Sequence, residues 1–265
     1  MHWVIQSNLF NEDGVNRLIE TLERGVIPYD LVKIIPFVGE MEHDLDITGN
    51  VICIGSYSMR HLAKKKGWVP GVFDLEPFTY DVCIEKWPGH MLNQDAVVVM
   101  FYDVMQFLHS DFNDEPVFIR PIADSKAFAG GIMDHAELSE FWQNMHNLLG
   151  NEDPSGMTFA TRVMMSKPKT ILREYRNWVV DGKVVTSSLY KNGNRVLYSD
   201  LVDQRIIDYA QARADEWQPL RAFVLDVALL PENQLKIVEI NTLNSSGLYA
   251  ANTNKLVEAI ESMKF

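Results

Sequence analysis

Residues 222–241 contain the feature that most limits how this chain can fold: two apolar, strand-forming runs on either side of a short polar segment. If residues 231–234 form the loop of a β-hairpin, Asp226 lies directly opposite Glu239. Side chains alternate between the two faces of a strand, so Asn241 lies on the same face as Glu239. The hairpin therefore predicts that two carboxylates and one amide meet.

The same register pairs Leu230 with Leu235. Two carboxylates that oppose each other across strands repel, and a divalent cation between Asp226 and Glu239 would relieve that repulsion. A set of oxygen ligands that includes Asn241 suits Mg²⁺, which commonly takes a few protein ligands and completes its shell with substrate phosphates. An ordinary hairpin with a solvated polar face is the alternative.

Length and composition favour a globular protein of one large or two closely packed domains, because 265 residues with 47% apolar content can bury a substantial core. No apolar run is long enough to span a membrane, and the N-terminal residues do not resemble a signal peptide, so a cytoplasmic location is expected. A net charge of −12 argues against a broad nucleic-acid surface but does not exclude a nucleotide pocket.

The cysteine and histidine patterns give little support for zinc or thiol chemistry. Cys53 and Cys83 are the only cysteines, both lie in apolar contexts, and we expect both in the core. The histidines occur singly, without the spacing of a zinc site.

The first 90 residues alternate between strand and helix patterns, which favours a small parallel α/β domain. Strands are expected at residues 3–7, 30–37 and 51–56, and helices at residues 12–24 and from Ser56 or Ser58 to about Gly67. From there on, Asn93 is expected to cap a helix over residues 94–108. A strand at 116–122, a loop at 123–131 and a helix from Asp134 to Leu149 follow, the last with an Asp-x-x-Glu capping signature. Asp181-Gly182 predicts a hairpin that pairs Val180 with Lys183, and helices are expected at 202–216 and 252–263.

Residues 118–131 place Arg120 at the end of a strand, Lys126 in a loop, and Gly130 and Gly131 beyond it. Such a loop can place backbone N–H groups and a lysine over phosphates. An exposed hairpin tip with incidental charge is the alternative.

In the Asp-Gly hairpin, a regular register puts Arg176 opposite Ser187 and Glu174 opposite Leu189. Glu174 and Arg176 then point the same way, either as an ion pair or with the arginine free to bind a phosphate. A surface salt bridge is the other interpretation.

Residues 164–169 join two methionines to two lysines. Met165 and Ser166 could line an adenine slot, and Lys167 or Lys169 could reach a phosphate. Core packing of the methionines and solvated lysines form the default interpretation.

The order of these motifs along the chain resembles the ATP-grasp superfamily. It is more similar still to a divergent clade of bacterial and phage proteins in which an arginine replaces the first phosphate-binding lysine. The resemblance covers most of the chain. It implies an α/β (α+β) ATP-grasp fold, with residues 1–90 as a Rossmann-like pre-ATP-grasp domain and residues 91–265 as the ATP-grasp domain.

By this resemblance, one or two Mg²⁺ ions would be held by Asp226, Glu239 and Asn241, and Arg120, Lys126 and Arg176 would act on the transferred phosphate. The sequence has no clear counterpart of the family's second lysine. The residues implied in ATP binding are Arg120, Lys126, Gly130, Met165, Ser166, Lys167, Glu174 and Arg176.

The resemblance implies an ATP- and Mg²⁺-dependent carboxylate–amine ligase that acts through an acylphosphate on a small molecule or a peptide. A nucleotide-binding assembly chaperone without ligase turnover is the main alternative, and a phosphotransferase is a third. Candidate substrate contacts are Tyr57, Arg60 and residues 244–247. The sequence indicates neither the acceptor nor the oligomeric state.

Overall fold

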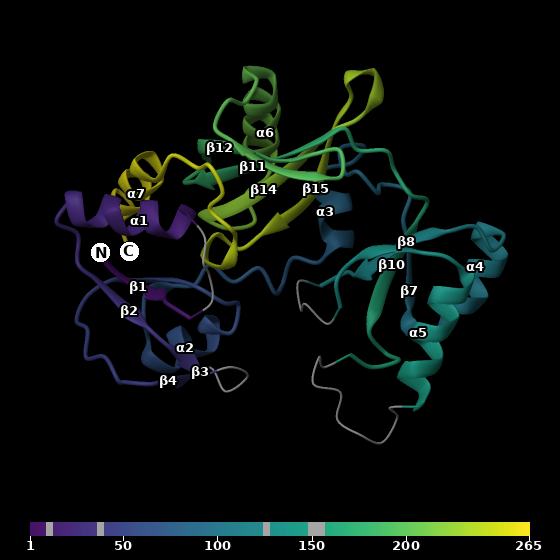
Figure 1. The fold of residues 1–265 in the computed structure, drawn as a ribbon, viewed down its shortest axis with the longest axis horizontal. Helices are drawn as coiled ribbons and strands as arrows, with labels where there is room; N and C mark the ends of the chain where they lie inside the picture. Colours follow the sequence, from purple (N-terminus) through teal and green to yellow (C-terminus); the bar gives the residue numbers. More distant parts are fainter. Residues whose placement is uncertain (9–12, 36–39, 124–127, 148–156) are drawn as a thin grey trace. The chain divides into compact units, whose positions relative to one another are not determined.

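The computed structural model describes residues 1–265 except 9–12, 36–39, 124–127 and 148–156. The chain forms two compact units, one made of residues 1–75 and 171–265 and the other of residues 76–170 (Figure 1). These units follow spatial compactness, so the expected domain boundary at residue 90 stays a prediction. Within the described residues, no helix combines the length and the apolar character that crossing a bilayer requires.

The first unit begins with a four-stranded sheet in the order β2-β1-β5-β6, in which all neighbouring strands are parallel. This agrees with the parallel α/β arrangement predicted from the alternating patterns. The elements of this part are β1 (His2–Gln6), α1 (Asp13–Arg24), β2 (Tyr29–Val32), β3 (Ile34–Ile35), β4 (Glu40–Met41), β5 (Val51–Ile54), α2 (Met59–Lys66) and β6 (Pro70–Gly71). Cys53 is buried in this sheet, as predicted.

The rest of the first unit is a five-stranded sheet in the order β13-β12-β11-β14-β15, with antiparallel neighbours. Its α6 packs against β11, β12 and β14. The elements are β11 (Arg173–Val180), β12 (Lys183–Asn192), β13 (Arg195–Ser199), α6 (Gln204–Glu216), β14 (Ala222–Leu229), η2 (Pro231–Asn233), β15 (Leu235–Asn241), η3 (Leu243–Ser245) and α7 (Thr253–Glu261).

One hydrophobic core joins the two sheets of this unit. Trp3 and Ile52 from the parallel sheet pack in the same cluster as Trp178 and Val224 from the antiparallel sheet and Leu256 from α7. Side chains two residues apart share a face of a strand. The face that reaches this core through Trp178 and Val224 therefore continues along β11 and β14 to the polar residues beyond them.

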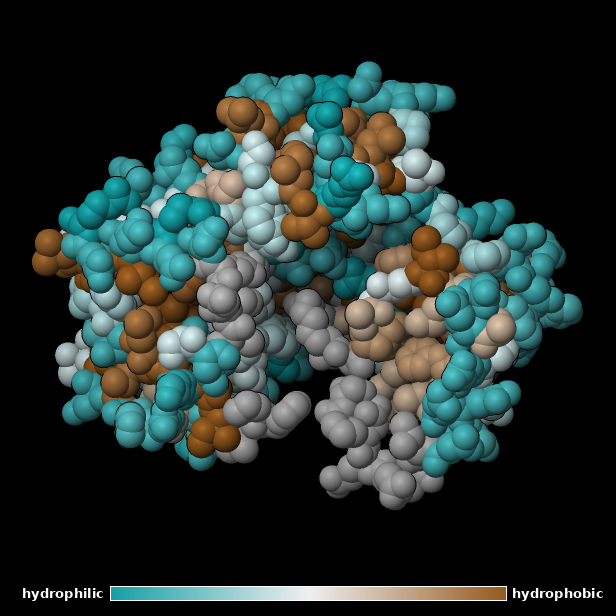
Figure 2. Space-filling view, viewed as in Figure 1, coloured by the Kyte–Doolittle hydropathy of each residue, from teal (hydrophilic) through white to brown (hydrophobic). Residues whose placement is uncertain are grey.

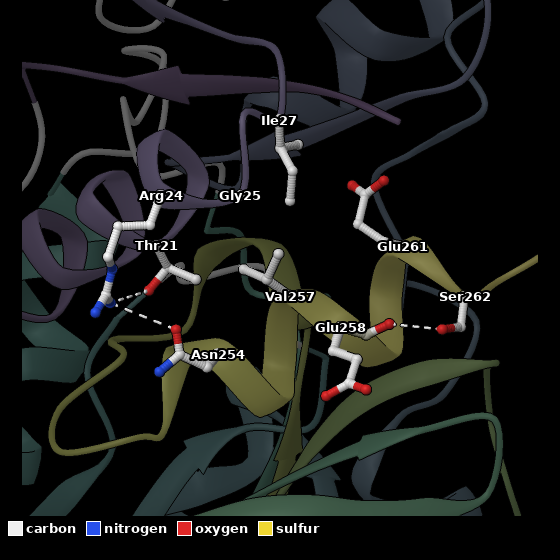
Figure 3. Close-up of a pocket in the computed structure, with 9 residues that line it drawn as sticks. All are labelled: Thr21, Arg24, Gly25, Ile27, Asn254, Val257, Glu258, Glu261 and Ser262. Carbon is white, nitrogen blue, oxygen red and sulfur yellow. Dashed lines mark hydrogen bonds between the residues drawn. The ribbon is translucent and has the colours of Figure 1, made fainter.

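A groove of about 490 Å³ lies between α1 and α7, and its lining includes Thr21, Arg24, Ile27, Val257 and Glu258 (Figure 3). Arg24 Nη2 donates to Thr21 Oγ1 and to Asn254 Oδ1, each at 3.4 Å. None of the site residues predicted from the sequence lines this groove.

The second unit is built on an antiparallel sheet in the order β7-β10-β8-β9. One face of the sheet packs on α4 and α5 through Val99, Leu108, Ile119, Leu138 and Met165. The elements are α3 (Tyr80–Lys86), β7 (Val97–Met100), η1 (Phe101–Asp103), α4 (Val104–Phe112), β8 (Val117–Pro121), β9 (Gly131–Met133), α5 (His135–Asn147) and β10 (Arg162–Ser166).

The helix expected over residues 94–108 is wrong in its first half. Val97–Met100 form β7, which pairs with β10, and the helix α4 begins only at Val104. The run of three valines from Val97 has a β-branched character that favours a strand, and the available sheet edge outweighs the helical spacing of the apolar residues.

The capping signature before α5 is confirmed. Glu137 N–H donates to Asp134 Oδ1, and Asp134 N–H donates to Glu137 Oε2, each at 2.9 Å. This reciprocal pair satisfies backbone donors that the first turn of a helix leaves without partners.

Candidate active site

Asp226 lies opposite Glu239 in the hairpin of β14 and β15, as predicted, although the loop register differs from the prediction. Leu229, and not Leu230, pairs with Leu235. A β-bulge between Asp226 and Val227 shifts the register by one residue and brings the two carboxylates back into opposition. Hydrophobic periodicity alone gives no signal for such a bulge.

Arg176 on β11 binds Asp226 with both arms of its guanidinium group. Its Nε donates to Asp226 Oδ1 at 2.9 Å and its Nη2 donates to Asp226 Oδ2 at 2.7 Å. β11 pairs directly with β14, so the strand register places the two residues side by side. Asp226 is fully buried, and a buried carboxylate needs such a partner to remain ionised.

This ion pair changes the electrostatic argument for a metal ion. Burial raises the pKa of the Asp226 carboxyl, and the Arg176 guanidinium opposes that rise. The repulsion between Asp226 and Glu239 is therefore already offset by a cation that belongs to the protein. The opposition of two carboxylates does not by itself require Mg²⁺.

The amide of Asn241 joins the two carboxylates. Its Nδ2 donates to Asp226 Oδ2 at 3.1 Å and to Glu239 Oε1 at 3.0 Å. A half-turn of this amide would place Oδ1 beside the same carboxylates and give a set of oxygen donors that suits Mg²⁺. Among the described residues, no group of three or more His, Cys, Asp and Glu could hold a metal ion. Any metal here would depend on the amide.

Glu174 does not pair with Arg176, contrary to the expected ion pair. Its Oε1 lies 2.8 Å from Lys191 Nζ, and its Oε2 accepts a hydrogen bond of 2.7 Å from the Tyr190 hydroxyl. The expected cross-strand partners are also wrong, because Arg176 lies opposite Ser188, and Glu174 lies opposite Lys191. Two bulges displace the register, although the predicted Asp-Gly turn is present and pairs Val180 with Lys183.

Three tyrosines stack beside Arg176. The ring of Tyr249 stacks on Tyr190 at 5.3 Å and on Tyr198 at 4.7 Å, and the guanidinium of Arg176 lies 4.8 Å from the centre of the Tyr249 ring. Burial raises the pKa of the Tyr190 phenol well above its usual range, which keeps the hydroxyl protonated as a donor to Glu174. These aromatic contacts hold the guanidinium in place and were not foreseen in the sequence.

The second unit contains Arg120 on β8, with its guanidinium 5.6 Å from the centre of the Tyr80 ring. Its Nε donates to Pro121 O at 3.2 Å. A Cβ atom at position 130 would lie only 2.9 Å from Arg120 Cβ, so Gly130 allows the chain to pass close to β8. Lys126 lies outside the described residues.

Met164 and Met165 point to opposite faces of β10. Met165 is fully buried in the core with α4 and α5, which favours the packing interpretation for this residue. Met164 lies opposite Arg120 and therefore shares its face of the sheet. An adenine slot on the Arg120 face would use Met164 and not Met165.

The remaining residues of this segment have distinct environments. Ser166 is fully buried, and its Oγ donates to Asn93 Oδ1 at 3.1 Å, so the helix cap expected of Asn93 is wrong. Lys169 Nζ lies 2.7 Å from Asp95 Oδ2, whereas Lys167 is exposed. Of the two lysines, Lys167 is therefore the one whose ammonium group forms no ion pair within the described residues.

The candidate substrate residues in the first unit are largely occupied by structural contacts. The Tyr57 hydroxyl donates to Asp74 Oδ1 at 2.9 Å, and the Arg60 guanidinium lies over the Tyr57 ring at 3.8 Å. Asn244 is buried and donates to the carbonyl oxygens of Cys53 and Gly71. Asn244 therefore ties the segment after β15 to the parallel sheet.

Solved structures with similar folds are ATP-grasp proteins. The RimK domain protein ATP-grasp from Sphaerobacter thermophilus DSM 20745 is 10% identical, with 99% of this chain and all of that chain covered and a TM-score of 0.66. The D-cycloserine synthetase DcsG is 12% identical, with 98% of each chain covered and a TM-score of 0.62. The ATP-grasp ligase PsnB complexed with a minimal precursor is 11% identical, with 98% of each chain covered and a TM-score of 0.57.

At these identities the structural similarity shows a common fold, and no curated protein matches the sequence. A family model matches residues 99–259, which is more than half of the chain, and it describes the ATP-grasp domain, family 2 of the arginine-for-lysine clade. The motif order along the sequence led to the same clade. The chain therefore belongs to the arginine-for-lysine clade of the ATP-grasp family.

Proposed function

We propose that this protein is an ATP- and Mg²⁺-dependent ligase that joins a carboxylate to an amine. The observation that carries the proposal is the buried Arg176–Asp226 pair, bridged by Asn241 to Glu239, in a chain of the ATP-grasp family. A buried cation beside a cluster of oxygen donors suits a reaction in which negative charge moves between phosphate oxygens.

The reaction follows from the chemistry of the two substrates. A carboxylate oxygen attacks the γ-phosphate of ATP, which releases ADP and gives an acylphosphate. The amine then attacks the acyl carbon, phosphate leaves, and the nitrogen loses a proton as the amide bond forms. Bound Mg²⁺ would offset the charge of the phosphates, and Glu239, Asn241 and Asp226 are the residues proposed to hold it.

The cations contributed by the protein have separate roles in this proposal. Arg176 is held rigidly by Asp226 and by the tyrosine rings, so its remaining donor capacity is oriented before any ligand arrives. Arg120, Lys126 and Lys167 would contact phosphates, and Gly130 would allow their close approach. Related proteins support these ligands, since PsnB has been solved with Mg and ADP and with a precursor peptide.

Titration calorimetry of ATP, with and without Mg²⁺, tests the nucleotide site. We expect Mg²⁺-dependent binding in the intact protein and a loss of at least about tenfold in Glu239→Ala and Asp226→Asn, equivalent to about 1.4 kcal/mol. Glu258→Ala on α7 removes an exposed carboxylate from another part of the unit and should bind normally. Unchanged affinity in Glu239→Ala would contradict the proposed metal site.

Turnover separates the ligase from the other two activities. A ligase releases ADP only when a carboxylate and an amine are both present. Tight Mg–ATP binding without ADP release on a broad panel of acceptors would favour the assembly chaperone. Accumulation of a stable phosphorylated acceptor would instead identify a phosphotransferase. The proposed location of this activity is the cytoplasm.

A further inference from the structure

The edge strand β13 of the five-stranded sheet exposes large apolar side chains. Val196 is 70% exposed, Leu197 47% and Tyr198 51%, and Leu201 just beyond the strand is 85% exposed. Within the described residues β13 pairs only with β12, so one edge of its backbone has no strand beside it. Figure 2 shows brown apolar atoms at the surface in the region where Figure 1 places the green strands of this sheet.

Such an edge is a template for another extended chain. Natural edge strands are usually protected by charges, prolines, bulges or a covering element. β13 has a single charged residue, Arg195, and alternates its apolar side chains between both faces. The strand is also fixed in position, because the N–H of Gly193 in the preceding turn donates to Leu172 O at 2.7 Å. A preformed edge loses little entropy when a peptide pairs with it.

Charge indicates which kind of peptide fits this edge. Arg173 on β11 and Arg195 on β13 both lie opposite Asn192, so the three side chains form one row across the sheet. Both arginines are exposed, and neither forms an ion pair with another described residue. In a chain with a net charge of −12, this row is a local positive site that complements carboxylates.

The edge is also connected to the candidate active site. Tyr198 stacks on Tyr249, Tyr249 lies against the guanidinium of Arg176, and Arg176 binds Asp226. All four residues belong to the first unit, so this path is internal to one compact body. A chain seated on β13 would thus lie three side-chain contacts away from Asp226.

We propose that β13 binds an extended acidic peptide by strand addition, and that this peptide is the substrate of the ligase. Backbone hydrogen bonds to the free edge would provide affinity. The arginine row would select carboxylate side chains, and the exposed apolar residues would contact the peptide side chains between them. The assignment of the peptide as substrate rests on the proposed ligase function, whereas its binding to β13 does not.

Fluorescence anisotropy with the full chain tests the binding. The probe is a fluorescein-labelled peptide of alternating glutamate and valine, about eight residues long, and the comparison peptide has lysine in place of glutamate. We expect the glutamate peptide to bind at least about tenfold more tightly than the lysine peptide. Its affinity should fall as the salt concentration rises from about 0.1 M to about 1 M, where the Debye length shortens from about 10 Å to about 3 Å.

Two variants localise the peptide. Arg173→Glu/Arg195→Glu reverses the arginine row, and Leu197→Pro removes a backbone donor and disturbs the edge. Each should weaken binding of the glutamate peptide at least about tenfold, while far-UV circular dichroism and Mg–ATP affinity stay unchanged. Lys64→Glu on α2 is the matched charge reversal away from β13 and should bind the peptide normally.

The outcomes for the two proposals are distinct. Absence of binding by the glutamate peptide, or undiminished binding by both variants, overturns the β13 site even if Mg–ATP binds well. Loss of Mg–ATP binding in the intact protein overturns the proposed function even if the peptide binds. A dimer in light scattering that Leu197→Pro converts to monomer would mean that β13 pairs with a second copy, and this also overturns the peptide proposal.

Discussion

Replacement of Arg176 by methionine would leave Asp226 buried without its counter-ion. The wild-type pair has two hydrogen bonds of 2.9 Å and 2.7 Å, and Asp226 has no exposed surface. Removal of one partner of a buried ion pair typically costs about 3–5 kcal/mol, because the remaining charge stays out of water. We expect Arg176→Met to lose that much stability. Asn241 supplies only a neutral hydrogen bond and cannot replace the guanidinium.

Urea unfolding followed by tryptophan fluorescence measures the effect, since Trp3 and Trp178 both lie in the core of this unit. With a slope of about 3 kcal/mol/M, the expected loss lowers the midpoint by about 1 to 1.7 M. The control is Arg176→Met/Asp226→Leu, which removes both charges and fills the space with apolar groups. We expect this double variant to recover most of the lost stability.

The loss should depend on pH in a defined direction. In Arg176→Met, burial raises the pKa of Asp226 and no guanidinium opposes the rise. A carboxyl whose pKa is higher in the folded than in the unfolded protein binds its proton more tightly when folded. Its contribution is then fully present below the unfolded pKa of about 3.9 and is lost as the pH rises through the folded value. The penalty relative to wild type should therefore be largest near neutral pH and shrink in acid. A penalty below about 1 kcal/mol at neutral pH, or one that grows in acid, would refute the account.

Three further predictions concern other parts of the chain. Asn244→Ala should cost about 2–4 kcal/mol in urea unfolding, because it leaves buried backbone groups without partners; a loss below about 1 kcal/mol would contradict that role. Cys53 and Cys83 are both buried, and burial raises the pKa of the Cys53 thiol to about 12, so neither should react with a thiol reagent until the protein unfolds; rapid labelling of the native protein would disprove this. Asp134→Ala should cost about 1 kcal/mol through the lost cap of α5, with Asp134→Asn as the control that retains most of it.

The sequence predicted best those features that depend on short spacings. The capping pair of Asp134 and Glu137, the Asp-Gly turn and the parallel sheet of the first residues follow from local propensity and periodicity. The opposition of Asp226 and Glu239 was also predicted, but the real register reaches it through a bulge. The bulge offsets the one-residue difference in the loop.

The features that the sequence did not predict depend on pairing between distant segments. Arg176 meets Asp226 because β11 adopts β14 as its second neighbour, and the choice of a neighbour has no signature in either strand alone. The bulges of β11 and β12 move Glu174 towards Tyr190 and Lys191 and away from Arg176. The valine run at Val97 became a strand because β10 offers an edge to it. Each of these outcomes is set by tertiary context.

The Arg176–Asp226 pair also has a consequence for the order in which ligands bind. Both oxygens of Asp226 accept hydrogen bonds from the guanidinium, so much of its charge is already neutralised before a metal arrives. Glu239 and Asn241 then offer one full charge and one neutral oxygen, which is a weak site for Mg²⁺ alone. Phosphate oxygens would supply the missing ligands and charge. We therefore expect Mg²⁺ to bind tightly only together with the nucleotide, and calorimetry of MgCl₂ without ATP should show little heat. Tight binding of Mg²⁺ to the nucleotide-free protein would mean that Arg176 leaves Asp226 when the metal binds.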